Sequence, residues 1–176
     1  LASAAPTVNL THRLTNNGLW TVELAPWAIT QLRLGGTVIL PLRMENADPA
    51  GLLANRQLSF WPYAKLTDPR LKLQDEYTTF NAESAPPFKM GYFNTHGWLA
   101  YWIDGVLFKK TFAAQTNANY PDNNSNAEIY CNEDFLELES LAPFVRLEPG
   151  QSVEHIETWE VRDSLPTELR VAMGKI

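Results

Sequence analysis

The feature that most constrains this sequence is a repeated alternation between short β-prone runs and turn signals. Runs rich in Val, Ile, Leu, Thr and aromatic residues recur roughly every 8–12 residues, and Asn-Gly, Gly-Gly, Asp-Gly or Pro-Gly pairs separate several of them. Helical periodicity is nearly absent. Because such short strands must reverse and pair with their neighbours, the pattern predicts an all-β fold, an antiparallel sandwich or barrel.

We expect strands at residues 7–15, 19–25, 27–33, 37–42, 57–63, 76–80, 88–93, 98–103, 106–112, 127–132, 135–140, 144–147 and 152–161. The clearest hairpin joins 98–103 to 106–112 through Asp104-Gly105, a pair that favours a type I′ turn. Asp48 before Pro49 predicts a short helix within 46–56. The polar segment 113–126 is expected to be a long loop of the kind that often carries function.

Length and composition indicate one globular domain. The chain has 176 residues, of which 45% are hydrophobic and 19% charged, so it can bury a core and does not resemble a disordered protein. We expect a sandwich domain over 1–164 and a terminal extension over 165–176.

Charge and cysteine content argue against several partners. The formal net charge is -6 without a stripe of Lys and Arg, so nucleic acid is not expected, and no apolar run approaches the ~20 residues of a membrane span. One Cys and three His show no zinc spacing, so we predict no metal and no cofactor. Leu1–Pro6 is rich in small residues, as signal-peptide ends are, which leaves a secreted, periplasmic or cytoplasmic location open.

The last expected strand carries titratable groups among apolar neighbours. His155 and Glu157 share one face with Val153, Trp159 and Val161, because side chains alternate along a strand. Two such groups are costly in a dry core without partners, so this face either lines a wet groove or belongs to an exposed edge.

Two carboxylates also share a face of the strand at 135–140. Glu137 and Glu139 could act as proton donor and acceptor, or could accept hydrogen bonds from sugar hydroxyls. The alternative is a solvated outer face of a half-buried strand.

Three further residues stand out by position. Lys110 and His12 each interrupt an apolar alternation, which can mark a site. The alternatives are structural: a long Lys110 side chain that reaches solvent, and a His12 side chain with hydrogen-bond partners in the core. Trp61 lies at a strand end, where an indole could stack on a sugar ring, although most of the six Trp are expected in the core.

Several phrases, taken in order, resemble an uncharacterised bacterial branch of the galactose-mutarotase-like (aldose-1-epimerase-like) proteins. They are HRLTNNG at 12–18, ELAPWAIT at 23–30, WPY at 61–63, FKMG at 88–91, YPD at 120–122, ELESLAP at 137–143 and ETW at 157–159. The resemblance covers nearly the whole chain and implies a large antiparallel β-supersandwich with a concave sugar-binding face.

The resemblance also implies residue roles. Mutarotases use a carboxylate base within a Leu-Glu-Thr-like phrase, and Leu138-Glu139-Ser140 is similar, so Glu139 is the expected base. Their histidine acid has no counterpart in 27–30; His12, His96 or His155 could substitute in space. Members are usually longer at the N-terminus, so the chain resembles a C-terminal part, a trimmed product or a minimal form. Its exposed sheet edge could then pair with a second copy.

These observations support three hypotheses: a carbohydrate-binding protein, an aldose-1-epimerase-like enzyme, or a structural or oligomerising β module. The expected ligand-binding residues beside Glu139 are Glu137, Lys110, Trp61, His12, His155 and Glu157.

Overall fold

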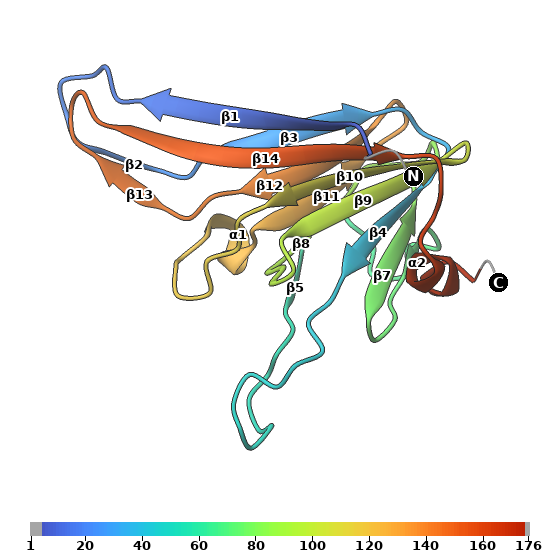
Figure 1. The fold of residues 1–176 in the computed structure, drawn as a ribbon. Helices are drawn as coiled ribbons and strands as arrows, with labels where there is room; N and C mark the ends of the chain where they lie inside the picture. The colour runs from blue at the N-terminus through green and yellow to red at the C-terminus, as the bar shows by residue number, and fades with distance from the viewer. Residues whose placement is uncertain (1–4, 175–176) are drawn as a thin grey trace.

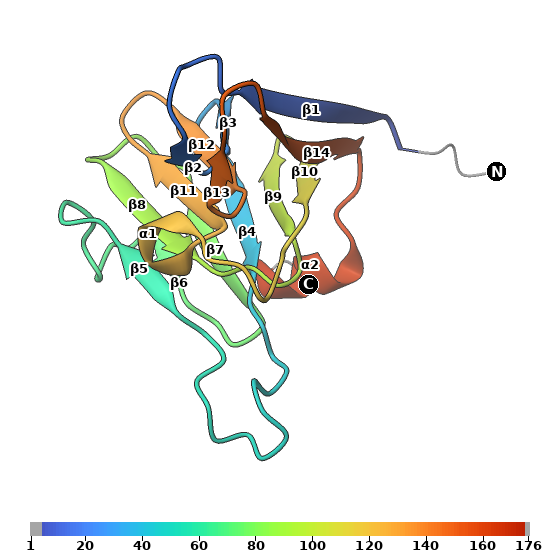
Figure 2. The same cartoon turned by 90° about the vertical axis from the view of Figure 1, so that its left-hand side faces the viewer.

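The computed structural model describes residues 5–174 and contains two antiparallel sheets packed face to face (Figures 1 and 2). The larger sheet consists, in spatial order, of β1 (Thr7–Thr15), β14 (Ser152–Arg162), β10 (Val106–Phe112), β9 (Trp98–Ile103), β4 (Thr37–Pro41), β7 (Tyr77–Asn81) and β6 (Leu71–Lys72). The smaller sheet consists of β3 (Trp27–Leu32), β12 (Leu136–Leu141), β11 (Ala127–Cys131), β8 (Phe88–Tyr92) and β5 (Leu58–Phe60). A separate ribbon pairs β2 (Val22–Leu24) with β13 (Val145–Leu147).

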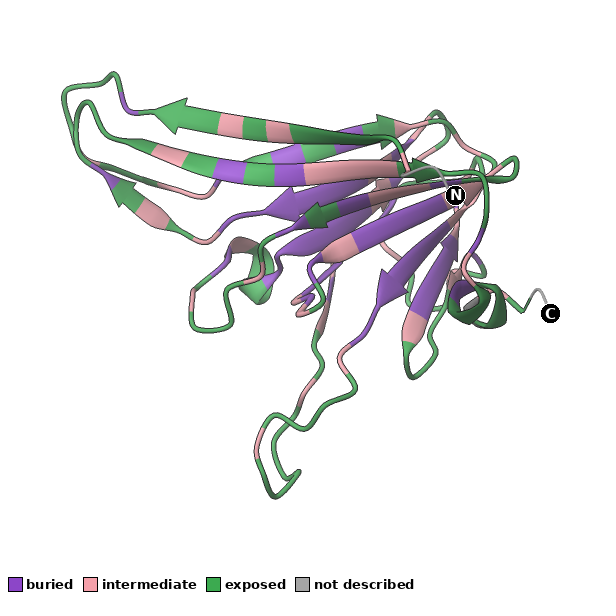
Figure 3. Cartoon of the chain, in the orientation of Figure 1, coloured by how far each residue is buried: buried purple, intermediate pink, exposed green. Residues whose placement is uncertain are grey.

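Alternate side chains of the two sheets fill one core between them. The larger sheet contributes residues such as Val38 and Phe80, and the smaller sheet contributes Phe88, Met90 and Leu138. The rings of Phe80 and Phe88 stack across the interface with centroids 4.8 Å apart. Burial is therefore greatest in the central strands and least in the edge strand β1 (Figure 3).

The predicted antiparallel β-sandwich is confirmed, and each of the expected strand ranges overlaps an observed strand. The hairpin at Asp104-Gly105 has positive φ at both central residues, 49° and 81°, as a type I′ turn requires. Strand β6 was not predicted, because two residues are too few to show an alternation.

The helix expected within 46–56 is wrong. The Asp48 carboxylate accepts hydrogen bonds from the backbone N–H groups of Ala50, Leu52 and Leu53, at 3.1, 2.9 and 2.8 Å. Gly51 has a φ of 67°, which reverses the chain after one turn. The residue that predicted a helix N-cap therefore closes a compact loop.

The two short helical elements lie in the segments expected to be a long loop and a terminal extension. Element α1 (Pro121–Asn124) interrupts the loop at 113–126, and α2 (Thr167–Ala172) lies in the segment after 164. Leu165 and Leu169 pack with Ile39, Ala100 and Leu107 on the outer face of the larger sheet, so this segment extends the packing of the sandwich. Residues 1–4 and 175–176, and the predictions that concern them, lie outside the described range. No described helix is long and apolar enough to span a membrane.

Gly97 is expected to be sensitive to substitution. Its φ is 64°, and an added Cβ would lie 2.4 Å from the carbonyl oxygen of Phe112. We predict that Gly97→Ala lowers the free energy of unfolding by about 2–3 kcal/mol, measured by urea denaturation. Gly150→Ala is the matched control, because Gly150 has a φ of 83° with open space around it. A loss no larger than that of the control would contradict the steric explanation.

Candidate functional site

The structure divides the predicted site residues between two clusters on opposite faces of the smaller sheet. Glu139 and Ser140 are neighbours on β12, so alternation directs them to opposite faces. The outward cluster, here named the Lys89 cluster, contains Trp27, Trp61, Lys89, Glu128 and Glu139. The cluster between the sheets, here named the Lys110 cluster, contains His12, Lys110, Ser140, His155 and Glu157.

Three adjacent strands place the charges of the Lys89 cluster. Glu128 on β11 is directly opposite Glu139 on β12, and Lys89 lies on the next strand, β8. The Lys89 Nζ atom is 2.8 Å from Glu128 Oε2 and 2.8 Å from Glu139 Oε2. One ammonium group therefore bridges two carboxylates.

Two indole rings flank this ammonium group. Lys89 Nζ lies 4.7 Å from the ring centroid of Trp61 and 4.9 Å from that of Trp27, both within the range of a cation–π contact. Trp27 Nε1 also donates a hydrogen bond to Glu139 Oε2 at 2.7 Å. The cluster thus combines charged groups with an aromatic rim.

The carboxylates are buried and only partly satisfied. Glu128 and Glu139 are 1% and 0% exposed, and Glu128 Oε1 and Glu139 Oε1 have no hydrogen-bond partner among the described residues. Burial raises the pKa of Glu128 to about 8, although the Lys89 ammonium opposes the shift. Glu128 is therefore mostly protonated at pH 7 and can donate a proton.

A small cavity adjoins the Trp61 side of the cluster. It has a volume of about 210 Å³ and is lined by Ser59, Phe60, Trp61, Pro62, Asp122 and Asn123. Asp122 and Asn123 have φ values of 51° and 57°, so α1 is a left-handed turn rather than an ordinary helix. This conformation is unusual for residues other than glycine, and it brings polar side chains of the long loop to the cavity.

The Lys110 cluster is a buried ion pair with a hydrogen-bond network. Lys110 Nζ is 2.6 Å from Glu157 Oε1, and the Ser140 hydroxyl donates to the same carboxylate oxygen at 2.5 Å. Because Ser140 has one proton to give, His155 Nε2, 2.7 Å away, donates to the Ser140 oxygen. His12 Nε2 lies 3.3 Å from Glu157 Oε2 at the sandwich edge.

This network satisfies the charges that it buries. Burial alone would raise the pKa of Glu157, but the Lys110 charge and hydrogen bonds from Lys110 and Ser140 lower it below the ordinary value. Lys110 is also within 3.3 Å of three oxygen acceptors on the facing sheet, those of Ala28, Thr30 and Leu138. The arrangement joins the two sheets, and its buried groups already have partners.

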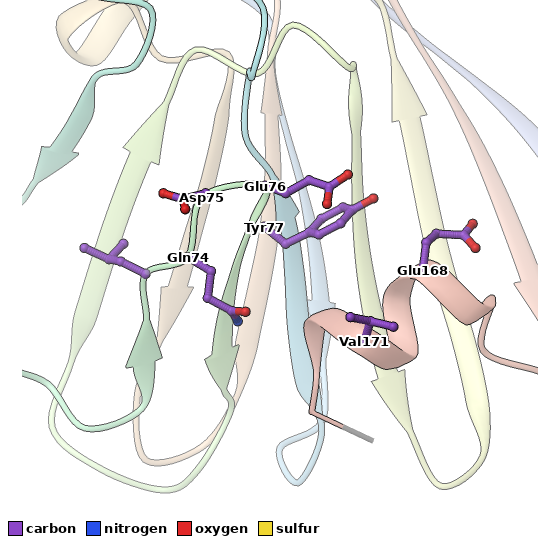
Figure 4. Close-up of a pocket in the computed structure, with 7 residues that line it drawn as sticks. Gln74, Asp75, Glu76, Tyr77, Glu168 and Val171 are labelled. Atoms are coloured by element: carbon purple, nitrogen blue, oxygen red, sulfur yellow. The ribbon is translucent and has the colours of Figure 1, made fainter. Parts of the chain in front are cut away.

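A different depression lies between the segment at 73–77 and α2 (Figure 4). It has a volume of about 390 Å³ and includes Asp75, Glu76, Tyr77 and Glu168. Tyr77 is the aromatic residue of its lining. Among residues 5–174, no group of three or more His, Cys, Asp or Glu side chains is arranged so that it could hold a metal ion. The Lys89 cluster, with its buried acceptors and indole rim, is therefore the better candidate site.

The structure brings together Glu139 and Trp61 and places Glu137 on the same outer face, where its Oε1 accepts a hydrogen bond from Gln31 at 3.1 Å. It places His12, Lys110, His155 and Glu157 between the sheets. The third histidine, His96, contacts the Leu42 carbonyl oxygen. The Glu139 carboxylate contacts the side chains of Lys89 and Trp27 rather than one of these three histidines.

Sequence reasoning missed Lys89, Glu128 and Trp27. Lys89 lies between Phe88 and Met90, and Glu128 lies between Ala127 and Ile129, so each interrupts an apolar run in an expected strand. These interruptions could have identified Lys89 and Glu128 as candidate site residues. What the sequence could not supply was the order β12-β11-β8, which makes these residues neighbours of Glu139.

No protein-family model matches the sequence, and comparison with curated proteins finds no match. Among solved structures, the chain is similar to one from Escherichia coli K12 named "Putative aldose 1-epimerase", with 15% identity and a TM-score of 0.56 over 89% of this chain and 56% of that chain. It is also similar to the Slr1438 protein from Synechocystis sp. PCC 6803 (9% identity, TM-score 0.47, 90% of this chain and 51% of that chain). A TPR-domain containing protein from Parabacteroides distasonis matches with 12% identity and a TM-score of 0.51, over 91% of this chain and 28% of that chain.

The chain therefore spans about half the length of the first two of these solved structures. At these identities the similarity concerns the fold, and it agrees with the fold that the sequence phrases implied. The chain has the galactose-mutarotase-like sandwich fold.

Proposed function

We propose that the chain binds a carbohydrate at the Lys89 cluster. The observation that carries the proposal is a pair of buried oxygens, Glu128 Oε1 and Glu139 Oε1, which have neither a hydrogen bond nor an ion pair within residues 5–174 and lie beside two indole rings. A buried polar atom without a hydrogen-bond partner is unfavourable, and a sugar offers several hydroxyl groups that donate and accept, together with a C–H face that stacks on aromatic rings. The adjoining cavity at Trp61 adds space for the ligand.

Trp61→Ala tests this site. Loss of the indole removes stacking area and part of the aromatic wall of the cavity, so we expect the dissociation constant of a bound sugar to rise about tenfold or more. The measurement is isothermal titration calorimetry against a panel of neutral hexoses, hexosamines, N-acetylhexosamines and hexuronic acids. Trp20→Ala is the matched control, because Trp20 is 78% exposed and lies outside the cluster. Equal affinity in both variants would move the site elsewhere, and no binding by the wild type would reject the function.

A second candidate function is epimerisation at the anomeric carbon. Glu128, protonated near neutral pH, lies opposite Glu139 in the strand pair, so a proton donor and an acceptor are side by side. In this reaction Glu139 would take the proton of the anomeric hydroxyl while Glu128 gives a proton to the ring oxygen, and the ring would open and close again on the other face. Polarimetry of a freshly dissolved sugar measures this activity, and binding without acceleration would leave only the first function.

A further inference from the structure

The carboxylates of the outer face outnumber its cations. Among the described outward positions of the five strands, Lys89 is the one cationic side chain, whereas Glu128, Glu137 and Glu139 are acidic. Asp122 adds another carboxyl group at the cavity. A ligand with a carboxylate or phosphate group would meet this surplus, and Lys89, the one cation at the described outward positions of the sheet, is already paired, so the charge disfavours acidic sugars.

The cluster already binds one ammonium group, its own. Lys89 Nζ lies 2.8 Å from an oxygen of each of two carboxyl groups, and 4.7 and 4.9 Å from the centroids of two indole rings. Carboxylates and indoles are the side chains that recognise ammonium groups through charge-assisted hydrogen bonds and cation–π contacts. Each carboxylate keeps its second oxygen, Glu128 Oε1 or Glu139 Oε1, buried and without a partner among the described residues.

We propose that the ligand is an amino sugar, a hexosamine whose ammonium group binds Glu128 Oε1 and Glu139 Oε1. This inference rests on the proposed carbohydrate-binding function. The ammonium group takes the place of the Glu128 proton, so that Lys89 and the ligand together supply two cations for two ionised carboxylates. In this arrangement the sugar ring lies against the indole rim that Trp27 and Trp61 form beside Lys89.

Binding of an ammonium group should also release a proton. Glu128 is surrounded by Lys89 on β8, Glu139 on β12 and Asp122 on α1, and its raised pKa keeps it protonated at pH 7. A cation placed against its oxygen favours the ionised form, so the proton leaves to solvent. A neutral sugar brings no positive charge, so it should not favour ionisation of Glu128 or release its proton.

The test is calorimetry at pH 7 in two buffers of different ionisation enthalpy, with a hexosamine, its N-acetyl derivative, the parent neutral hexose and the corresponding hexuronic acid. We expect the hexosamine to bind about tenfold more tightly than the N-acetyl derivative, which keeps the nitrogen and loses the charge. We also expect net proton release for the hexosamine and none for the neutral hexose. The uronic acid should bind most weakly.

Glu128→Gln should abolish both the hexosamine preference and the proton release, whereas Glu133→Gln, which makes the same charge change at an exposed position of the β11–β12 turn, should retain both. If Glu128→Gln prevents folding, the comparison of the four ligands on the wild type still tests the amino-sugar assignment. Equal or tighter binding of the neutral or acidic sugar overturns the amino-sugar assignment and leaves carbohydrate binding intact. Absence of binding by all four ligands overturns both proposals.

Discussion

Lys110→Met is expected to lower the free energy of unfolding by about 3–5 kcal/mol, because it leaves a buried carboxylate without its countercharge. Lys110 and Glu157 are 0% and 1% exposed, so water cannot replace the lost ammonium group. The Glu157 carboxylate would keep the Ser140 hydroxyl and the more distant His12 and Trp159 donors. Because small domains are stable by about 5–15 kcal/mol, the variant should unfold at a much lower urea concentration.

Two controls separate loss of the ion pair from loss of a long side chain. Lys109→Met alters the neighbouring lysine, which contacts the Trp98 ring at 4.9 Å on the opposite face, and should cost less than about 1 kcal/mol. The double variant Lys110→Met with Glu157→Leu should recover much of the loss, since no unpaired charge remains. A single Lys110 variant as stable as the Lys109 control would mean that the pair is not buried in solution.

The fold was predictable because its signals are local. Strand periodicity and the Asp104-Gly105 turn depend on residues close in the sequence, and the structure agrees with both. Asp48 shows the limit of such reasoning. An Asp carboxylate can accept hydrogen bonds from backbone N–H groups either as a helix N-cap or within a tight loop. Here Asp48 accepts three such bonds within a loop, which the positive φ of Gly51 favours over a helix.

The site was predictable only in part because its residues are distant in the sequence. Alternation correctly grouped Glu137 with Glu139, and His155 with Glu157, on shared strand faces. It could not show that the two pairs lie on opposite sides of the smaller sheet, because that depends on which strands pack against each other. Long-range strand order, set by the whole core, makes Lys89 the partner of Glu139 and Lys110 the partner of Glu157.

Glu128 should make the protein less stable as the pH rises from about 5 to 8, and Glu128→Gln should remove this dependence. In the folded protein the pKa of Glu128 is raised to about 8, whereas in the unfolded chain it has its ordinary value of about 4.3. Between these values the folded state binds the extra proton, so stability is full below the unfolded pKa and is lost as the pH rises through the folded pKa. One proton corresponds to at most about 1.4 kcal/mol per pH unit.

The measurement is urea denaturation of the wild type, Glu128→Gln and Glu133→Gln at several pH values, followed by tryptophan fluorescence. Other groups also titrate, so the informative quantity is the stability of each variant minus that of the wild type. For Glu128→Gln this difference should rise by about 2 kcal/mol or more between pH 5 and pH 8, while for the exposed Glu133 it should stay nearly constant. A flat difference for Glu128→Gln would show that its carboxyl group is ionised at neutral pH, and it would remove the proton donor required by the epimerase candidate.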